Sequence, residues 1–472
     1  MAISSLFARV KNAAELFVQM GEDEVLHVFS HNDTDGLTSA AIVTYLCRVF
    51  NKQLHLKTFK QLRPSVIESI ERKFSPKEVM FVDFGSGQLE AIFNTLKSTK
   101  RAVILDHHVP QEVDRVPPFQ IVHVNPHHFG FDGDREISSA GVCFLLAYTF
   151  SEQISVDALF PLAIAGALGD SQLSEEDKLV SLNKLILEKA KERDVLLEKE
   201  ESLRLFGKEY KPLFKALATT FHPILPGISG SLDAALEFLK ETLGEKEHLS
   251  ELKYSDLTEK ERDTVIESLL KRLLFTSEEK NVEQVRERLF GVAYHNKKEK
   301  TGRLKDLLEF SAVVNACGRM DHPEIGIRLA LGERGDALKQ AISLREENRE
   351  KVSTLLKKAM AEGRKEGDLF LVNGIKWLDE NFASIIASIL SSLKREVKVI
   401  AVFSHSDEKT AKLSLRLSEE KSDKNLNELV QAAMRNIQEA SGGGHKSAAG
   451  AYIPYSEMEA FTKNLKSYLK AE

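Results

Sequence analysis

The sequence predicts an α/β protein in three parts: an N-terminal, doubly wound and mostly parallel sheet, a helical connector, and a smaller C-terminal α/β domain. Three observations predict it. Short runs of β-forming residues alternate with helical stretches over about the first 170 residues. Lys, Glu and Leu then recur with helical spacing, and strand-like runs become scarce. From about residue 368 the alternation returns. We therefore expect domains at residues 1–172, 173–335 and 336–472.

The first domain is expected to contain five strands separated by helices. Helical stretches follow the first three strand-like runs, and strands that alternate with helices favour a parallel sheet. Two strongly apolar runs, SAGVCFLLAYTF and ALFPLAIAGALG, are typical of buried helices near the end of this domain. The expected strands are residues 25–29, 54–59, 78–83, 101–105 and 120–124.

The rest of the chain is expected to be helical first and mixed later. In the connector, Pro and Gly mark one loop at residues 219–231. The highly charged stretch 336–366 predicts a solvated helix. Beyond it, DLFLV, VKVIAVFS, AKLSLR and GAYI are expected strands. Helices are expected around WLDENFASIIASILSSL, at 424–440 and at the end of the sequence.

Composition narrows the classes of function. The 472 residues are 42% hydrophobic and 29% charged, which is ordinary for a protein with a sizeable core. The three Cys residues lie far apart without a CxxC pair, which excludes a zinc ribbon or disulfide framework and fits a reducing, cytoplasmic location. The net charge of -6 means that a nucleic acid would have to be bound by local basic groups or by metal. Because no apolar run approaches about 18 residues, we expect neither a signal peptide nor a membrane span.

Acidic residues and histidines follow four successive segments of the first domain. Ligands bind at the carboxyl ends of strands in such sheets, so we expect these side chains to lie on one rim. So many carboxylates repel one another unless cations lie between them. Mixed His and Asp ligands suit Mn²⁺ or Mg²⁺, and two such ions bridged by a carboxylate form a site for phosphoester hydrolysis. The residues are His31, Asp33, Asp35, Asp83, Asp106, His107, His108 and Asp170.

Each of these residues also has a simpler interpretation. A single Asp after a strand is usually a turn or N-cap residue. His31 alone would be a structural histidine, and Asp-His-His alone a solvated turn. The joint pattern of four acidic segment ends in order favours the two-metal interpretation.

These segments resemble the four motifs of the DHH phosphoesterase superfamily. HNDTDG, VDFGSG, LDHH and ALGD occur in the family's order, and SSAG (138–141) resembles its Ser/Gly helix start. SGGGHKSAAGAYI resembles the GGGH signature of the DHHA1 domain, and NACGRM (315–320) resembles a segment of RecJ-type exonucleases. LRLFGKEYKPLFKAL (203–217) resembles the connector of archaeal RecJ-like proteins. Nearly the whole chain thus resembles archaeal RecJ-like single-strand exonucleases, nearest to their helicase-associated branch.

The resemblance implies a role for each motif residue. His31, Asp33 and Asp83 would hold one ion of Mn²⁺ or Mg²⁺. The second ion would be held by Asp35, Asp83, His107 and Asp170, with Asp83 bridging. His108 would face the scissile phosphate, and Asp106 would orient a ligand histidine and fix its tautomer. The resemblance places substrate binding on Ser139, Arg319, Arg416, Gly442, Gly443, Gly444 and His445.

Two of these substrate-binding expectations also have a physical reason. Without Cβ atoms, the backbone N–H groups of the three glycines could approach a phosphate, although a flexible turn is the alternative. The fork of an Arg side chain suits phosphate, although Arg319 and Arg416 could instead form surface salt bridges.

His123, His127 and His128 suggest a further metal site, which we do not expect. They lie around a Pro/Gly loop without an accompanying carboxylate pattern, so a solvated or supporting role is favoured. Phe129 and Phe131 on the same loop could stack on a base or simply pack the loop.

The leading functional hypothesis is a two-metal-ion exonuclease on single-stranded DNA or RNA. A cleft between two α/β domains would admit a single strand, releasing nucleoside monophosphates from one end, with a lean towards 3′→5′ polarity. The alternatives are a phosphodiesterase acting on short oligonucleotides or cyclic dinucleotides, and a non-catalytic replisome or helicase-associated scaffold. The resemblance also implies roles in DNA repair or replication and a helicase or replisome partner. A homo-oligomer is the default expectation.

Overall fold

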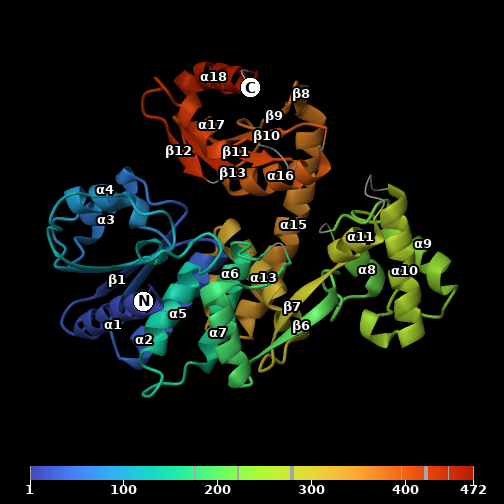
Figure 1. Ribbon diagram of the computed structural model, residues 1–472, viewed down its shortest axis with the longest axis horizontal. Helices are drawn as coiled ribbons and strands as arrows, with labels where there is room; N and C mark the ends of the chain where they lie inside the picture. The colour runs from blue at the N-terminus through green and yellow to red at the C-terminus, as the bar shows by residue number, and fades with distance from the viewer. Residues whose placement is uncertain are drawn as a thin grey trace. The chain divides into compact units, whose positions relative to one another are not determined.

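The computed structural model describes residues 2–470, apart from 175, 221–222, 277–280, 395, 419–423 and 445. The chain folds into two units, Met1–Ala341 and Ile342–Glu472, and many of their elements are labelled in Figure 1. The predicted fold class is confirmed: a parallel sheet comes first, a helical middle follows, and a second sheet domain ends the chain.

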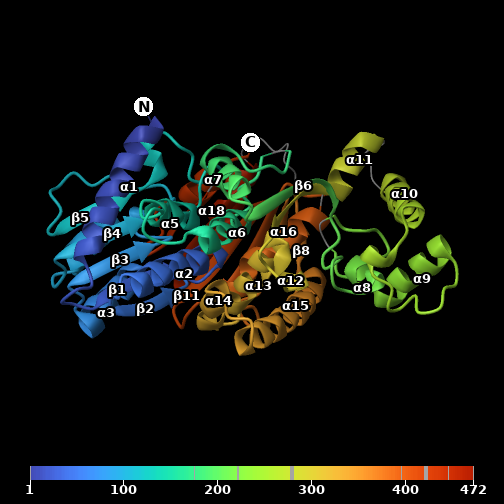
Figure 2. The ribbon, with the colours of Figure 1, turned by 90° about the horizontal axis from the view of Figure 1, so that it is seen from below.

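The first unit is built on a five-stranded, fully parallel sheet in the order β2-β1-β3-β4-β5 (Figure 2). Its central strands are buried on both faces, which explains their continuous apolar sequences. All five were expected from the sequence to within two residues. The strands are β1 (Leu26–His31), β2 (Leu54–Phe59), β3 (Glu78–Val82), β4 (Arg101–Leu105) and β5 (Gln120–Val124).

Helices cover both faces of this sheet. On one face α3 and α4 pack through Ile67, Ile70 and Ile92 onto strand residues that include Phe81. On the other, α1, α2, α5 and α6 pack together, and α1 lies along β5. The helices are α1 (Ala2–Gln19), α2 (Thr34–Val49), α3 (Pro64–Phe74), α4 (Leu89–Thr95), α5 (Ser139–Tyr148), α6 (Phe160–Gly169) and α7 (Ser181–Glu192).

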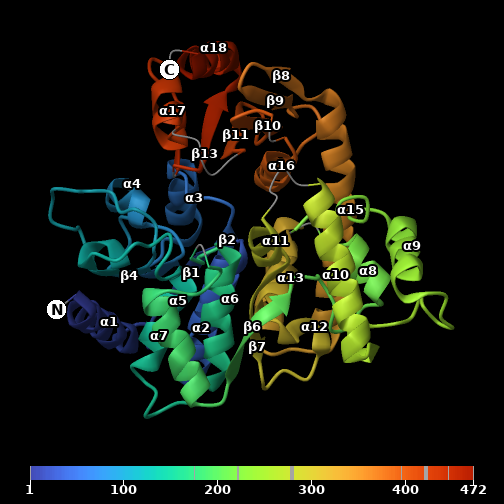
Figure 3. The ribbon, with the colours of Figure 1, turned by 45° about the vertical axis from the view of Figure 1, so that its right-hand side comes forward.

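The connector contains a two-stranded antiparallel ribbon that the sequence analysis missed. β6 (Leu196–Leu203) pairs with β7 (Phe290–Asn296) across almost ninety residues. β6 has the sequence LLEKEESL, and its exposed charges conceal the strand pattern. Between the two strands, four helices share a core of their own (Figure 3). They are α8 (Leu213–Ala218), α9 (Leu232–Leu243), α10 (Glu259–Thr276) and α11 (Val282–Leu289).

After β7 the chain returns to the parallel-sheet domain. α13 packs against α6, and α14 packs against α2. This return places the NACGRM segment, the end of α13, beside the first motif of the sequence. The helices are α12 (Gly302–Lys305), α13 (Leu307–Arg319) and α14 (Pro323–Ala330).

The second unit holds a six-stranded mixed sheet in the order β12-β13-β11-β10-β9-β8. Its expected strands are present, and two short edge strands, β8 and β12, were not expected. β12 is the triple-glycine segment, which pairs with β13 instead of forming a turn. The helix α15 (Asp336–Glu362) spans the unit boundary. The elements after it are β8 (Arg364–Glu366), β9 (Leu369–Asn373), α16 (Glu380–Leu393), β10 (Val399–His405), β11 (Thr410–Leu417), α17 (Leu426–Ala433), β12 (Ser441–Gly444), β13 (Ala448–Pro454) and α18 (Met458–Lys470).

Among the residues that the structure describes, no helix combines the length and the apolar composition that crossing a membrane requires.

Candidate metal centre

Four segments of the first unit bring acidic residues and histidines to one place. β1, β3 and β4 end at the same edge of the parallel sheet, and α6, which packs against α2, ends beside them. Those residues are His31 at the end of β1, Asp33 and Asp35 at the start of α2, Asp83 after β3, Asp106–His108 after β4, and Asp170 after α6.

Three groups of potential ligands share one carboxylate; two of them match the predicted ligand sets, and the other is Asp83, His107 and His108. His31, Asp33 and Asp83 form the first group. The second joins Asp83 to three further residues, and in each group the ligand atoms lie within 4.8 Å of one another. The structure thus brings together the six positions that the sequence analysis had assigned to metals. The second group is Asp35, Asp83, His107 and Asp170.

The spacing of these atoms suits ligands of a common ion. His107 Nε2 lies 3.4 Å from Asp170, 3.5 Å from Asp83 and 3.9 Å from Asp35, in each case to a carboxylate oxygen. These distances are long for hydrogen bonds. Metal–ligand bonds of about 2.1 Å place neighbouring ligand atoms roughly 3 to 3.5 Å apart. The arrangement therefore fits atoms that surround a metal better than a network of direct ion pairs.

Both candidate histidine ligands are held by backbone carbonyl groups. His31 Nε2 lies 3.0 Å from the carbonyl oxygen of Lys60, and His107 Nδ1 lies 2.7 Å from that of Gly133. Each of these nitrogens donates to its carbonyl, so the other ring nitrogen carries the lone pair once the ring is neutral. In both rings that second nitrogen faces carboxylates, with His31 Nδ1 2.8 Å from Asp33. The histidines are therefore oriented as metal ligands.

Asp83 fits a bridging role. Its side chain is buried, and neither carboxylate oxygen has a hydrogen-bond partner. A buried carboxylate without partners is costly unless a cation compensates it. Its backbone is left-handed, with φ of 64°, a conformation that Asp tolerates better than most residues. These features fit a carboxylate shared by two divalent ions.

Asp35 is positioned by the N-terminus of α5. Its two carboxylate oxygens accept from the backbone N–H groups of Ser139 and Ala140, at 2.7 Å and 2.9 Å. A Cβ on Gly166 of α6 would overlap Asp35, so this approach needs glycine. Ser139 itself is fully buried. Its backbone N–H supports Asp35, and its hydroxyl is buried without a hydrogen-bond partner, so the expectation that Ser139 binds substrate stays a prediction.

The carboxylates have strongly altered proton affinities in the metal-free site. Burial, then the charge of Asp83, raises the pKa of Asp35 to about 7. Burial and the charge of Asp35 hold the pKa of Asp170 well above its ordinary value. Burial alone would raise the pKa of Asp83 as well, but the nearby His107 and His31 rings lower it well below the usual range. Protons on Asp35 and Asp170 thus offset charge that metal ions would otherwise neutralise.

Asp106 contacts the ring of His108 rather than the ring of His107. Asp106 Oδ1 lies 2.8 Å from His108 Nδ1, whereas the His107 ring is oriented by the Gly133 carbonyl. The expectation that Asp106 orients a ligand histidine stays a prediction; the ring that it contacts is that of His108, which forms one group of potential ligands with Asp83 and His107. A ring nitrogen of His108 still lies near Asp83 and His107, and its side chain is 51% exposed. Burial would lower the pKa of His108, but the charge of Asp106 raises it.

The NACGRM segment packs directly against the first motif. Asn32 Nδ2 donates to the carbonyl oxygen of Gly318 at 3.3 Å, and a Cβ on Gly318 would overlap the Asn32 backbone. The next residue is the half-buried Arg319. Burial lowers its pKa, and the charge of Asp33 opposes this shift in part. Arg319 therefore follows a residue, Gly318, that packs on Asn32 between the candidate ligands His31 and Asp33.

The predicted substrate-binding residues of the second unit lie on its sheet. Arg416 on β11 is half-buried and donates to Ser388 Oγ at 3.0 Å and to the Leu415 carbonyl at 2.8 Å. Gly442–Gly444 pair with Ala449–Ala451 of β13. His445 lies outside the described residues.

His123, His127 and His128 belong to none of the groups of potential metal ligands found among the described residues. His123 Nε2 lies 2.7 Å from Ser86 Oγ, and its Nδ1 lies 3.4 Å from His128 Nε2. Phe129 and Phe131 are half-buried.

Several supporting residues had no signal in the sequence. The carbonyl groups of Lys60 and Gly133 act through the backbone, which sequence patterns do not reveal. Gln172 also donates to the Gly133 carbonyl, at 2.7 Å. Gly166 stands inside an apolar helical run, where a glycine indicates a close approach, so it could have been noticed.

Comparison with known proteins gives the family. Profiles of the DHH family N-terminal domain, the DHH-CID domain and the DHHA1 domain match residues 26–168, 205–285 and 370–471. The chain is 30% identical over 444 residues to the uncharacterized protein MJ0831 of Methanocaldococcus jannaschii, covering 93% of this chain and 92% of that protein. The chain belongs to the DHH/DHHA1 superfamily. This is a family of phosphoesterases and nucleases.

Solved structures share the fold of this DHH/DHHA1 protein. RecJ of Thermus thermophilus in complex with Mn²⁺ is 16% identical with a TM-score of 0.56. The match covers 99% of this chain but only 55% of that RecJ chain. CDC45 of Entamoeba histolytica is 10% identical with a TM-score of 0.66, and 97% and 98% of the two chains are covered.

Proposed function

We propose that this DHH/DHHA1 protein is a metal-dependent exonuclease that hydrolyses single-stranded DNA or RNA from one end and releases nucleoside monophosphates. The observation that carries the proposal is the pair of ligand groups that share Asp83. Two divalent ions bridged by a carboxylate are the usual arrangement for phosphodiester hydrolysis. The solved structures that share this fold include a RecJ in complex with Mn²⁺, which supports Mn²⁺ or Mg²⁺ here.

The protein's own groups have separate tasks in this proposal. When bound, the ions supply a deprotonated water and take up charge on the phosphoryl group. The backbone carbonyls behind His31 and His107 hold both rings in the metal-binding tautomer. His108, held by Asp106 and half exposed, would donate from its other ring nitrogen to a phosphate oxygen. Its raised pKa favours the protonated form that such a donor needs.

We propose that substrate is held by residues of both units. Arg319 supplies a guanidinium beside the metal centre. Arg416, His445 and the segment Gly442–Gly444 are the proposed phosphate contacts of the second unit. In this division, residues 1–172 carry the chemistry, 173–335 connect, and 336–472 bind substrate. A helicase or replisome component is the proposed partner of the connector.

The test uses single-stranded DNA and RNA oligomers labelled at the 5′ or the 3′ end, with Mn²⁺, Mg²⁺ or EDTA. We expect a metal-dependent ladder that shortens from one end, with 3′→5′ as the proposed polarity. Cleavage of only short oligonucleotides or cyclic dinucleotides would replace the exonuclease by the smaller phosphodiesterase. No cleavage of any of these substrates would contradict the proposal.

A non-catalytic scaffold is the second candidate, because the CDC45 fold matches nearly the whole chain. The complete set of potential ligands argues against lost activity. Asp35→Ala separates the two ideas. If the protein is an enzyme, the variant binds a labelled single strand as the wild type does but no longer shortens it. If it is a scaffold, wild type and variant bind equally and neither cleaves.

A further inference from the structure

We propose that His123 is a positioning residue for His108, acting through Ser86 and Asp106. The inference rests on the proposed hydrolysis, in which His108 contacts the phosphate. It assigns a task to a histidine outside the four motifs, on β5, and to the serine of VDFGSG.

Ser86 connects the two sides of this network. Its backbone N–H donates to Asp106 Oδ2 at 2.9 Å, and Asp106 Oδ1 lies 2.8 Å from His108 Nδ1. On the other side, Ser86 Oγ lies 2.7 Å from His123 Nε2. Asn125 Nδ2 donates to both Ser86 Oγ and the His108 carbonyl, each at 2.8 Å. Ser86 is fully buried, so these are its partners in place of water.

The direction of each hydrogen bond follows from the chemistry of the groups. An amide nitrogen only donates, so Ser86 Oγ accepts from Asn125. Ser86 Oγ has a second lone pair, but its own buried proton also needs an acceptor, and among the described residues the structure gives it only His123 Nε2. The hydroxyl therefore donates to His123 Nε2. His123 is therefore neutral with its proton on Nδ1, the nitrogen that faces His128 at 3.4 Å. Burial, which lowers the pKa of His123 to about 4, keeps this form stable near neutral pH.

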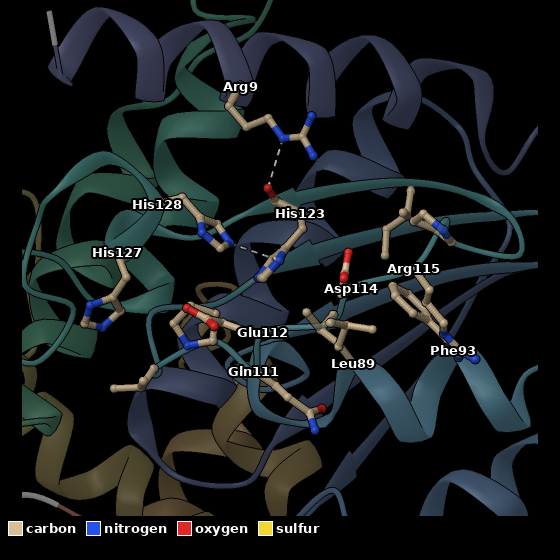
Figure 4. A pocket seen from close by; sticks show the side chains of 15 residues that line it. Arg9, Leu89, Phe93, Gln111, Glu112, Asp114, Arg115, His123, His127 and His128 are labelled. Carbon is tan, nitrogen blue, oxygen red and sulfur yellow. Dashed lines mark hydrogen bonds between the residues drawn. The ribbon is translucent and has the colours of Figure 1, made fainter.

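The position of His123 allows its ring to be replaced without disturbing the core. The ring lines an open cavity of about 740 Å³ together with Arg9, Phe93 and His128 (Figure 4). Arg9 Nε donates to the His123 carbonyl at 3.0 Å, so the backbone here is held independently of the ring. Because the ring borders a cavity, a replacement of similar size removes its acceptor without opening a hole in the core.

The test compares His123→Leu, His123→Gln and Ser86→Ala by steady-state kinetics on a labelled single strand. Without the acceptor on His123, the Ser86 side chain is no longer held in place. The Asp106 carboxylate and the His108 ring, which depend on Ser86, then lose their fixed positions. We expect kcat to fall about 10-fold in His123→Leu and in Ser86→Ala, with KM and Mn²⁺ affinity unchanged. His123→Gln keeps an acceptor near the position of Nε2 and should stay within about 2-fold of wild type. The double variant that combines His123→Leu with Ser86→Ala should have the same kcat as either single variant, because each substitution removes the same hydrogen bond.

The matched control is Glu112→Leu, which changes the wall of the same cavity at an exposed position and leaves the network in place, and it should keep wild-type kcat. Equal losses in the Leu and Gln variants of His123, additive losses in the double variant, or an equal loss in Glu112→Leu would each overturn the inference.

A second measurement is independent of any activity. Nitrogen-15 NMR of the histidine rings in the metal-free protein reports protonation and tautomer directly. We expect His123 to be neutral at pH 6 with its proton on Nδ1, and Ser86→Ala to shift the signals of both His123 and His108. A proton on His123 Nε2, or an unchanged His108 signal in Ser86→Ala, would overturn the inference. A wild type that cleaves nothing would instead overturn the proposed function and leave this measurement to decide the network.

Discussion

Asp83 belongs to each group of potential metal ligands in the described part of the chain. It is buried and left-handed, and neither of its oxygens has a hydrogen-bond partner. In the metal-free site the His31 and His107 rings, at 3.4 Å and 3.5 Å, offset its charge. A side chain with this combination is maintained for a ligand rather than for stability.

Replacing Asp83 by asparagine therefore tests the shared role of this carboxylate. The amide keeps the size of the side chain but lacks a charge to bridge two ions, so we predict that Asp83→Asn loses at least about 100-fold in strand hydrolysis. Asp233→Asn, at an exposed position of α9, is the matched control and should keep full activity. Retained hydrolysis in the Asp83 variant would show that another group holds the ions.

The ligand residues should also release protons when a metal binds. Asp35 has its pKa raised to about 7, and the pKa values of His31 and His107 are raised well above the ordinary value, because the surrounding carboxylates outweigh burial. Each group must lose its proton before it binds a metal, so affinity should rise with pH.

We predict that Mn²⁺ binds at least about 10-fold more tightly at pH 8 than at pH 6. Calorimetric titration in two buffers of different ionisation enthalpy measures both the affinity and the number of protons released. Equal affinity at the two pH values, with no proton released, would contradict the electrostatic account of the site.

At the scale of elements, the metal centre depends on how closely α6, α5 and α2 approach one another. Gly166 on α6 leaves room for Asp35, which the first N–H groups of α5 hold in place. The geometry of one ligand is therefore set by three helices that are separate in sequence.

Gly166→Ala should disturb this arrangement. The added Cβ would overlap an Asp35 oxygen, so we predict a loss of about 10- to 100-fold in Mn²⁺ affinity and a lower melting temperature. Gly335→Ala is the control, because a Cβ there meets no atom within 4 Å. Wild-type Mn²⁺ affinity in Gly166→Ala would show that the helices adjust.

The sequence predicts the elements whose pattern is local and misses those that depend on distant partners. The central strands β3 and β4 were expected because burial on both faces makes them continuous apolar runs, and the outer strands β2 and β5 because short runs of β-forming residues mark them. β6 and β12 were not, since one is rich in charge and the other is glycine. The ligand positions could be predicted from ordered motifs. The supporting carbonyl of Gly133 and the burial of Ser139 could not, because they arise from the packing of separate segments.

At the scale of the whole molecule, the proposal divides chemistry and substrate binding between the two units. Arg416 in the second unit should then affect binding alone. We predict that Arg416→Ala raises KM for a single strand about 10-fold and leaves Mn²⁺ affinity unchanged. Lys398→Ala, which removes an exposed cation of the same unit that is paired with Asp368, is the control and should keep wild-type KM. An unchanged KM in Arg416→Ala would remove this residue from the proposed phosphate contacts.

The central claim is that two divalent ions share Asp83, and anomalous diffraction from crystals of the full chain soaked in Mn²⁺ tests it most directly. We predict two peaks about 3.5–4 Å apart on either side of the Asp83 carboxylate. One ion should contact His31 and Asp33, and the other Asp35, His107 and Asp170. A single peak, or peaks that leave Asp83 without a metal contact, would contradict the claim.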